Sequence, residues 1–244
     1  MAESIRITVV AEDRPDFQIA NSLADRVVVE NVDWTDGNLP QLRTWQGLEP
    51  GKVFTKWSAL RRLSERAGRR IRTQIKKEGA TRQEARKAVL LALQMEPDNP
   101  PDLVLLVRDT DNDSRRRSSF LDVAQDASLG TRVLIAMPHT KREAWVLASF
   151  EASPGDEHRK LEQERGRLGF NPTSQPEKLT AQAPNSKREA KKALSALTGG
   201  DLERERRCWE ETPLPTLSAR GNKCGLTDYF IAVSDRLVPL FKKA

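Results

Sequence analysis

The stretch DLVLLVRDTDND, residues 102–113, decides the fold expected for this chain. Its first half is a continuous apolar run of strand length, and its second half holds a cluster of acids. Short apolar runs rich in leucine and valine are typical of strands buried on both faces of a parallel sheet. The stretch IRITVVAED, residues 5–13, has the same plan. Together the two stretches predict a parallel sheet with carboxylates at the ends of its strands.

On either side of these strands, segments with the apolar spacing of a helix alternate with segments that have the pattern of a strand. Helical spacing follows the first strand from Pro15, a short strand is expected at 27–30, and the Gly and Pro punctuation of 31–53 predicts a loop. The remaining elements are expected as helices at 55–78, 81–94, 115–128 and 141–152, and as a strand at 131–140. This order predicts an α/β domain over residues 1–152 with a mostly parallel sheet and a basic helical insertion at about 55–95.

Beyond residue 152 the composition becomes polar and charged, with few aromatic residues. The pattern predicts a helical C-terminal extension over residues 153–244, with helices near 157–167, 186–197 and 200–209. The last amphipathic stretch, 226–241, is expected to pack back on the sheet domain.

Composition restricts the class of protein. The chain has 244 residues, 37% of them hydrophobic and 31% charged, with a formal net charge of +6. Two cysteines, Cys208 and Cys224, are too few for a disulfide scaffold or a cysteine zinc site, and we expect both to be reduced. No apolar run approaches the ~20 residues of a membrane helix, so no membrane partner is expected. The start, MAESIRITVVAED, lacks the features of a secretory signal, which favours a cytoplasmic protein.

Carboxylates follow both apolar strands. In open α/β sheets ligands bind at the carboxyl ends of the strands, where these acids would converge. Clustered carboxylates repel one another unless a hard cation neutralises them, and Mg²⁺ or Mn²⁺ takes such oxygen ligands. The candidate ligands are Glu12, Asp109, Asp111 and Asp113, with Asp16 as a supplementary one. The plainer interpretation is that aspartates favour exposed turns.

The strand-ending Glu12 and the later Asp109-Thr110-Asp111 resemble the motifs of the Toprim fold, which topoisomerases, primases and OLD-family nucleases share. The Toprim pattern close to E-G-x-x-D corresponds to Glu12-Asp13-Arg14-Pro15-Asp16, in which Asp13 replaces the glycine. The segment MPHTKREAWVLASFE, residues 137–151, is similar to that of RloB-like proteins, with Arg142 in place of a phenylalanine. The resemblance covers about residues 5–152.

The resemblance implies a Toprim-like nuclease that uses Mg²⁺ or Mn²⁺ to hydrolyse DNA or RNA. By this resemblance Glu12 would act as general acid/base or metal ligand, Asp109 and Asp111 would hold the metal, and Asp113 or Glu143 would supplement them. RloB-like members imply an effector of antiphage defence, controlled by an ABC-type or AAA-type ATPase partner. Topoisomerase chemistry would need a nucleophilic tyrosine, and the sole tyrosine, Tyr229, lies in a predicted amphipathic helix, so hydrolysis is favoured.

Basic residues supply the candidate nucleic-acid contacts, because lysine and arginine bind phosphates without regard to sequence. A solvated helix face is an equally good interpretation of most of them. The candidates are Arg61, Arg62, Arg69, Arg70, Lys76, Lys77, Arg115 and Arg116.

Two other interpretations stay open. The missing glycine and the change at Arg142 favour a non-catalytic Toprim-like subunit that binds nucleic acid or acts as a scaffold. A phosphatase of the haloacid-dehalogenase type also uses Asp-x-Asp after a strand, but normally on its first strand, whereas here the motif comes after residue 100. The sequence does not decide whether the substrate is DNA or RNA, what triggers the activity, or whether the protein forms a homo-oligomer.

Overall fold

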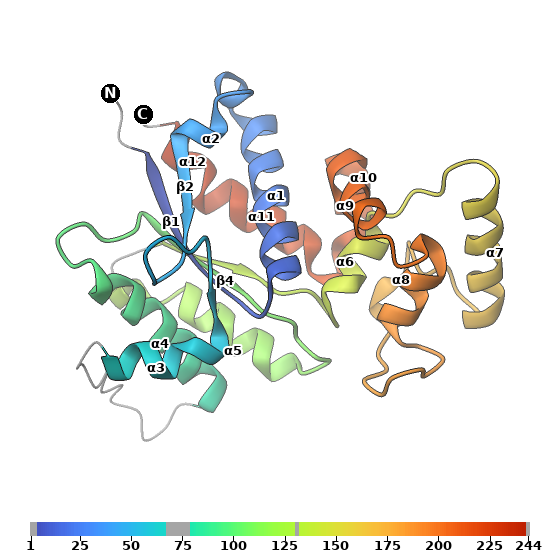
Figure 1. Cartoon of the computed structure of the whole chain (residues 1–244), viewed down its shortest axis with the longest axis horizontal. Helices are drawn as coiled ribbons and strands as arrows, with labels where there is room; N and C mark the ends of the chain where they lie inside the picture. Colours follow the sequence, from blue (N-terminus) through green and yellow to red (C-terminus); the bar gives the residue numbers. More distant parts are fainter. Residues whose placement is uncertain (1–3, 67–78, 130–131, 243–244) are drawn as a thin grey trace. The chain divides into compact units, whose positions relative to one another are not determined.

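The computed structural model describes residues 4–66, 79–129 and 132–242. These residues form an α/β protein in which five strands make one all-parallel sheet flanked by helices (Figure 1). The α/β class expected from the sequence is confirmed, as are the helices that follow the sheet. The strands are β1 (Ile5–Ala11), β2 (Arg43–Gln46), β3 (Thr55–Lys56), β4 (Leu103–Val107) and β5 (Arg132–Ala136).

Helices make up most of the remaining described chain. Up to the fifth strand they are α1 (Arg14–Asn31), α2 (Leu39–Leu42), α3 (Leu60–Arg66), α4 (Ala80–Met95) and α5 (Ser114–Ala124). After the fifth strand they are α6 (Arg142–Ala148), α7 (Asp156–Leu168), α8 (Ala190–Thr198), α9 (Leu202–Glu211), α10 (Leu214–Gly221), α11 (Leu226–Arg236) and α12 (Val238–Phe241).

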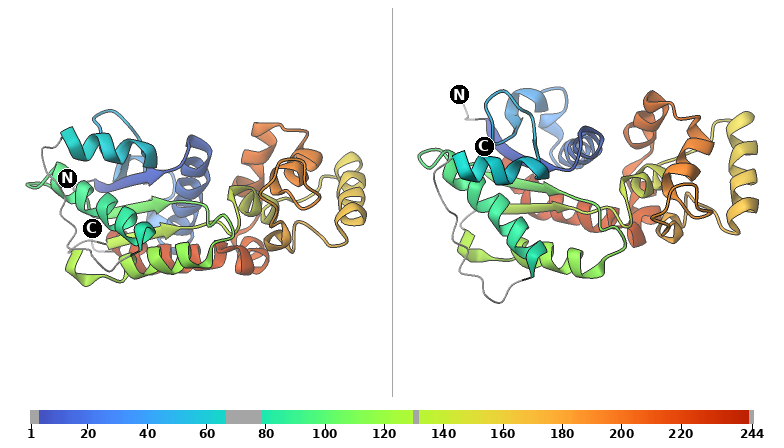
Figure 2. Two further views of the ribbon diagram at one scale, coloured as in Figure 1. Left: turned by 90° about the horizontal axis from the view of Figure 1, so that it is seen from below. Right: turned by 60° about the horizontal axis from the view of Figure 1, so that its bottom comes forward.

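The sheet has the strand order β2-β1-β4-β5, and β3 pairs with the last residues of β1. Val10 of β1 lies opposite Leu106 of β4, which in turn lies opposite Ile135 of β5. Because β2 and β5 lie on opposite sides of the central pair, right-handed crossovers put α1 on one face and α4 and α5 on the other. Consistent with this, α12 contacts α1, and α4 contacts α5 (Figure 2).

The sheet is buried on both sides, as its continuous apolar strands predicted. Every residue of β4 is at most 1% exposed. The helix α1 presents Leu23, Ala24 and Val28 to this core, and all three are fully buried. Burying each large apolar side chain contributes roughly 1.5–3 kcal/mol, so the central strands are the main source of stability in the sheet.

Contacts divide the chain into two compact units. The sheet unit comprises Met1–Arg108, Asp113–Ala136 and Ala232–Ala244. The helical unit comprises Asp109–Asn112 and Met137–Ile231. This division differs from a single boundary at residue 152, because the chain leaves the sheet unit after β5 and also contributes its last residues to that unit.

The expected strand at 27–30 is wrong. These residues are the last turns of α1, where Val27 and Val28 continue the buried stripe of the helix. Their β-branched side chains favour strands, but burial against the sheet outweighs that preference of a few tenths of a kcal/mol.

The second strand lies instead in the segment expected as a loop. It is β2, Arg43–Gln46, which follows the short helix α2. Its residues pair with the first half of β1, and Trp45 packs edge to face with Phe17 of α1. The helix expected at 55–78 begins with the strand β3 and continues as α3; residues 67–78 lie outside the described residues.

At the centre of the helical unit lies α6, which contacts α8, α9 and α10. All residues of Ala144–Ala148 are fully buried. Trp145 stacks on Tyr229 with ring centroids 5.2 Å apart, and its Nε1 donates to the carbonyl of Cys224 at 2.8 Å. Tyr229 is thus a packing residue, 1% exposed, as expected from the amphipathic pattern around it.

Candidate functional site

Glu12 directly follows β1, and Arg108 directly follows β4, the neighbouring parallel strand. The two strands therefore deliver their next residues to the same edge of the sheet, as the sequence analysis expected. An ion pair joins them, with Arg108 Nε 3.2 Å from Glu12 Oε1. Within the sheet unit, the carboxylate of Glu12 is thus paired with the positively charged guanidinium of Arg108.

Arg108 has several further contacts in the sheet unit. Its Nη1 donates to the carboxylate of Glu84 in α4, and its guanidinium lies over the ring of Trp57, 5.1 Å from the centroid. The indole of Trp57 is fixed in turn, because its Nε1 donates to the carbonyl of Val107 at 2.8 Å. Two carboxylates and an aromatic face thus hold one partly buried guanidinium at the carboxyl edge of the sheet.

The other acids after β1 belong to the start of α1. Asp13 is the N-cap residue, and its backbone N–H donates to the carboxylate of Asp16 at 3.0 Å. Asp13 also forms an ion pair with Lys56. Acids in the first helical turn are favoured by the helix dipole, so these two aspartates have a structural role at this position.

Asp109 and Asp111 lie in the short segment of the helical unit that follows β4. Between them Thr110 is fully buried; its N–H donates to the carbonyl of Pro138 at 3.0 Å, and its Oγ1 lies 2.9 Å from Nδ1 of His139. The N–H of Asp111 donates to the carbonyl of Thr140 at 2.9 Å. Backbone hydrogen bonds to residues 138–140 therefore hold this segment.

The segment ends in a left-handed turn. Asp111 has a φ of 48° and Asn112 a φ of 63°, values that Asp and Asn tolerate better than other residues with a Cβ. The side chain of Asp111 is exposed and that of Asp109 is half-buried. Two carboxylates thus lie on one tightly held turn. Outliers of this kind cluster at functional sites.

Asp113 and the arginines after it belong to the start of α5. Asp113 is the N-cap residue, and its Oδ1 accepts from the N–H of Arg115 at 2.9 Å. Arg115 is exposed, and Arg116 is half-buried in the same first turn. Glu143 lies in the first turn of α6 in the helical unit, where it pairs with Arg142 at 3.5 Å.

Two of the candidate nucleic-acid contacts on the expected basic helix, Arg61 and Arg62, are described and have carboxylate partners. Arg61 pairs with Glu65 at 3.1 Å, and Arg62 pairs with Glu49 at 3.1 Å. Both side chains keep about half or more of their surface exposed, so a phosphate could compete for them. The other members, Arg69, Arg70, Lys76 and Lys77, lie outside the described residues.

The structure thus brings Glu12 to Arg108 in the sheet unit, and it holds Asp109 and Asp111 together on the turn of the helical unit. Over residues 4–66, 79–129 and 132–242, no three His, Cys, Asp or Glu side chains form a group that could hold a metal ion. A site that combines Glu12 with the two aspartates stays a prediction.

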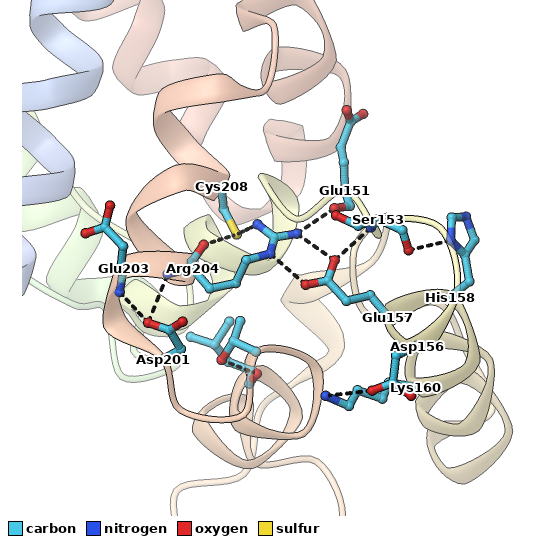
Figure 3. Close-up of polar contacts among 12 residues, drawn as sticks. Glu151, Ser153, Asp156, Glu157, His158, Lys160, Asp201, Glu203, Arg204 and Cys208 are labelled. Carbon is cyan, nitrogen blue, oxygen red and sulfur yellow. Dashed lines mark hydrogen bonds and ion pairs between the residues drawn. The ribbon is translucent and has the colours of Figure 1, made fainter.

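A polar pocket of about 240 Å³ in the helical unit was not anticipated from the sequence. Arg204 of α9 is one of its lining residues, and Figure 3 shows this side chain between Cys208 and Glu157. Its Nε and Nη2 donate to the two carboxylate oxygens of Glu157 at 2.7 and 2.9 Å, and Nη2 also donates to the carbonyl of Glu151 at 2.7 Å. The pocket is lined by Glu151, Ala152, Ser153, Arg204, Arg207, Cys208, Glu211 and Thr212.

Charge pairing sets the protonation states around this pocket. The hydrogen bonds from Arg204 lower the pKa of Glu157 to about 2, so this carboxylate is ionised at neutral pH. Burial raises the pKa of the Cys208 thiol to about 11, which keeps it protonated and a poor nucleophile. No local motif could have revealed the pocket, because its walls come from residues about 50 positions apart.

Among the described helices, none has the length and apolar character needed to cross a bilayer.

Comparisons with known proteins do not assign this chain to a family. No family model, no curated protein and no solved structure matches the chain.

Proposed function

We propose that this protein is a Toprim-like nuclease that hydrolyses phosphodiester bonds with Mg²⁺ or Mn²⁺. The observation that carries the proposal is the turn after β4, where Asp109 and Asp111 flank a buried threonine at the carboxyl end of a central parallel strand. Ligand sites of open α/β sheets lie at such strand ends. Mg²⁺ commonly takes one or two carboxylates and completes its shell with water and substrate phosphate, so this pair of acids fits the ion.

The protein residues would divide the work as follows. Asp109 and Asp111 would hold the cation, which when bound lowers the pKa of a coordinated water and stabilises charge on the attacked phosphate. The hydrogen bonds from the 109–112 segment to residues 138–140 would keep both carboxylates in place. Glu12 takes the role of general acid/base by the resemblance, and Arg108 orients its carboxylate within the sheet unit.

A metal titration tests the proposal. We expect calorimetry with Mn²⁺ to give a binding heat for the wild type and none for Asp109→Asn/Asp111→Asn. Cleavage of single-stranded and duplex substrates, both DNA and RNA, should need added Mg²⁺ and should disappear in the double variant. Asp36→Asn, which removes an exposed carboxylate from a turn in the sheet unit, is the matched control and should keep both properties. Normal cleavage by the double variant contradicts the proposal.

The biological setting is also proposed from the resemblance. The nuclease would be the effector of an antiphage system in which a partner ATPase controls cutting. The gene encoding this chain should then lie beside one for an ABC-type or AAA-type ATPase. Protection in a plaque assay should require both genes and the intact Asp109-Asp111 pair; protection by the double variant would contradict a nuclease effector.

One observation favours a second candidate, a non-catalytic Toprim-like subunit that binds nucleic acid. Arg108 already places a guanidinium between Glu12 and Glu84, where it balances charge without a metal. Under this alternative, titration of the wild type with Mn²⁺ should give no binding heat, and Asp109→Asn/Asp111→Asn should not change nucleic-acid binding. The same titration therefore separates the two candidates.

A further inference from the structure

A cluster of cations lies between α7 and α8 and on the first turn of α8 in the helical unit. Residues 178–192 hold five cations and one carboxylate, that of Glu189. All five side chains are exposed. We call them the α8 basic surface, which consists of Lys178, Lys187, Arg188, Lys191 and Lys192.

The cations of this surface differ in charge pairing from several arginines on the neighbouring helices of the helical unit. On α7 and α9, Arg159, Arg165 and Arg206 each form an ion pair with a carboxylate one turn away. Within the described part of the chain, none of the five cations of the α8 basic surface has a carboxylate at ion-pair distance. Glu189 lies among them, but its carboxylate accepts from the N–H of Asn185. Positive charge is therefore in clear excess over residues 178–192, which hold five cations and one carboxylate.

The loop that carries this surface is fixed in place. Arg167 Nη1 donates to the carbonyl of Lys187 at 2.6 Å, and the N–H of Ala181 donates to the carbonyl of Arg188 at 3.2 Å. The ring of Phe170 contacts two of the cations, with its centroid 5.6 Å from Lys178 Nζ and 5.9 Å from Arg188 Cζ. These contacts hold like charges near one another, which is unfavourable in isolation and becomes favourable when an anionic polymer binds.

The distribution of apolar residues separates a nucleic acid from a membrane as the partner. A helix that binds a lipid surface needs an exposed apolar face to insert beside its cations. In α8 the apolar residues Ala193, Leu194 and Leu197 are at most 1% exposed and belong to the core of the unit. Lys191 and Lys192 lie on the opposite, solvent-facing side with Ser195. The exposed apolar residue of α8 is Ala196, whose methyl group is too small to anchor a helix in a lipid surface, so this charged face fits a phosphate backbone.

We propose that the α8 basic surface binds the phosphodiester backbone of a nucleic acid, independently of sequence. The surface lies outside the basic residues that the sequence singled out at 61–77 and 115–116. The surface would bind the nucleic-acid substrate of the proposed nuclease, and this part of the inference rests on the proposed function. Its binding needs neither metal nor cleavage.

Salt-dependent binding tests the proposal. Fluorescence anisotropy with a labelled single-stranded DNA, and with an RNA of the same sequence, is measured in EDTA for the wild type and Lys191→Gln/Lys192→Gln. Each lost phosphate contact lowers the slope of log Kd against log salt by about 0.7 on single strands, so the double variant should lose about 1.4. Its affinity for both oligonucleotides should fall at low salt.

A matched control removes the same charge elsewhere. Arg159→Gln/Arg206→Gln also takes two positive charges from exposed sites of the helical unit, but from sites with carboxylate partners. This control should keep the wild-type slope, and circular dichroism should show that both variants fold.

Three results would overturn the proposal: equal slopes for the wild type and Lys191→Gln/Lys192→Gln, an equal loss in the control, or binding to anionic vesicles without binding to either oligonucleotide. A protein that binds through this surface in EDTA but never cleaves supports this inference while contradicting the proposed nuclease.

Discussion

At the residue scale, Glu157 links two distant parts of the helical unit. Its carboxylate accepts two hydrogen bonds from Arg204 and one from the N–H of Ser153. Charge-assisted contacts of this kind are stronger than neutral ones and are weakened by partial exposure to solvent.

The pH dependence of this contact can be predicted with its sign. Hydrogen bonds from Arg204 lower the pKa of Glu157 to about 2 in the folded protein, below the value of 4.5 expected when unfolded. Its contribution is therefore fully present above pH 4.5 and is lost as the pH falls toward 2. We expect Glu157→Gln to cost about 1 kcal/mol at pH 7 and to lose less stability between pH 4.5 and 2 than the wild type. Urea unfolding at several pH values measures both, with the exposed Glu162→Gln as control.

Trp145 is the largest fully buried side chain of the helical unit. Its replacement by alanine removes the stack on Tyr229 and the hydrogen bond to Cys224, and it leaves a cavity. The carbonyl of Cys224 still accepts from the N–H of His139, so the loss is mainly one of packing. We expect Trp145→Ala to cost about 4 kcal/mol in the free energy of unfolding. Trp34→Ala, which removes a half-exposed indole, should change the free energy of unfolding by no more than about 0.5 kcal/mol.

At the element scale, the sequence predicted helices and strands correctly where the apolar pattern of one type continued over the whole element without interruption. The apolar runs of β1 and β4 and the amphipathic pattern of α4 gave their elements to within a few residues. The pattern failed at Val27 and Val28, where a local β preference opposed a helix whose buried face was already set by the sheet. It also missed β2, because the four residues Arg43–Gln46 become a strand only through pairing with β1.

The same distinction applies to the candidate site. The positions of Glu12 and Asp109 after neighbouring parallel strands could be predicted, because strand ends follow from apolar runs. The ion pair of Arg108 with Glu12 and the capping roles of Asp13 and Asp113 depend on side-chain directions that spacing does not specify.

A connection in the helical unit depends on one glycine. Gly225, between α10 and α11, has a φ of 85°, and a Cβ there would lie 2.6 Å from the carbonyl oxygen of Met137. We expect Gly225→Ala to cost about 3 kcal/mol from the left-handed backbone and the clash together. Gly37 has a φ of 72° but open space around it, so Gly37→Ala should cost only about 1 kcal/mol. Equal losses in urea unfolding would contradict this account.

At the scale of the whole molecule, the two cysteines report on unfolding of the helical unit, which contains both of them. Burial raises the pKa of Cys208 to about 11 and that of Cys224 to about 12, and both side chains are at most 1% exposed. We expect neither thiol to react with Ellman's reagent at pH 8 in the native protein, and both to react in guanidinium chloride. Rapid reaction of a native thiol would show that the helical unit opens locally.

The C-terminal residues complete the sheet unit that the N-terminal residues begin. Arg236 at the end of α11 donates to the carbonyls of Ala124 and Val133 at 2.6 Å, and Phe241 of α12 is 1% exposed. During synthesis on a ribosome, α1 emerges long before α12, so the part of α1 that contacts α12 stays uncovered until α12 has been made. All residues of the helical unit have been synthesised once residue 231 has emerged, whereas the sheet unit still lacks residues 232–241 and leaves apolar surface accessible to chaperones.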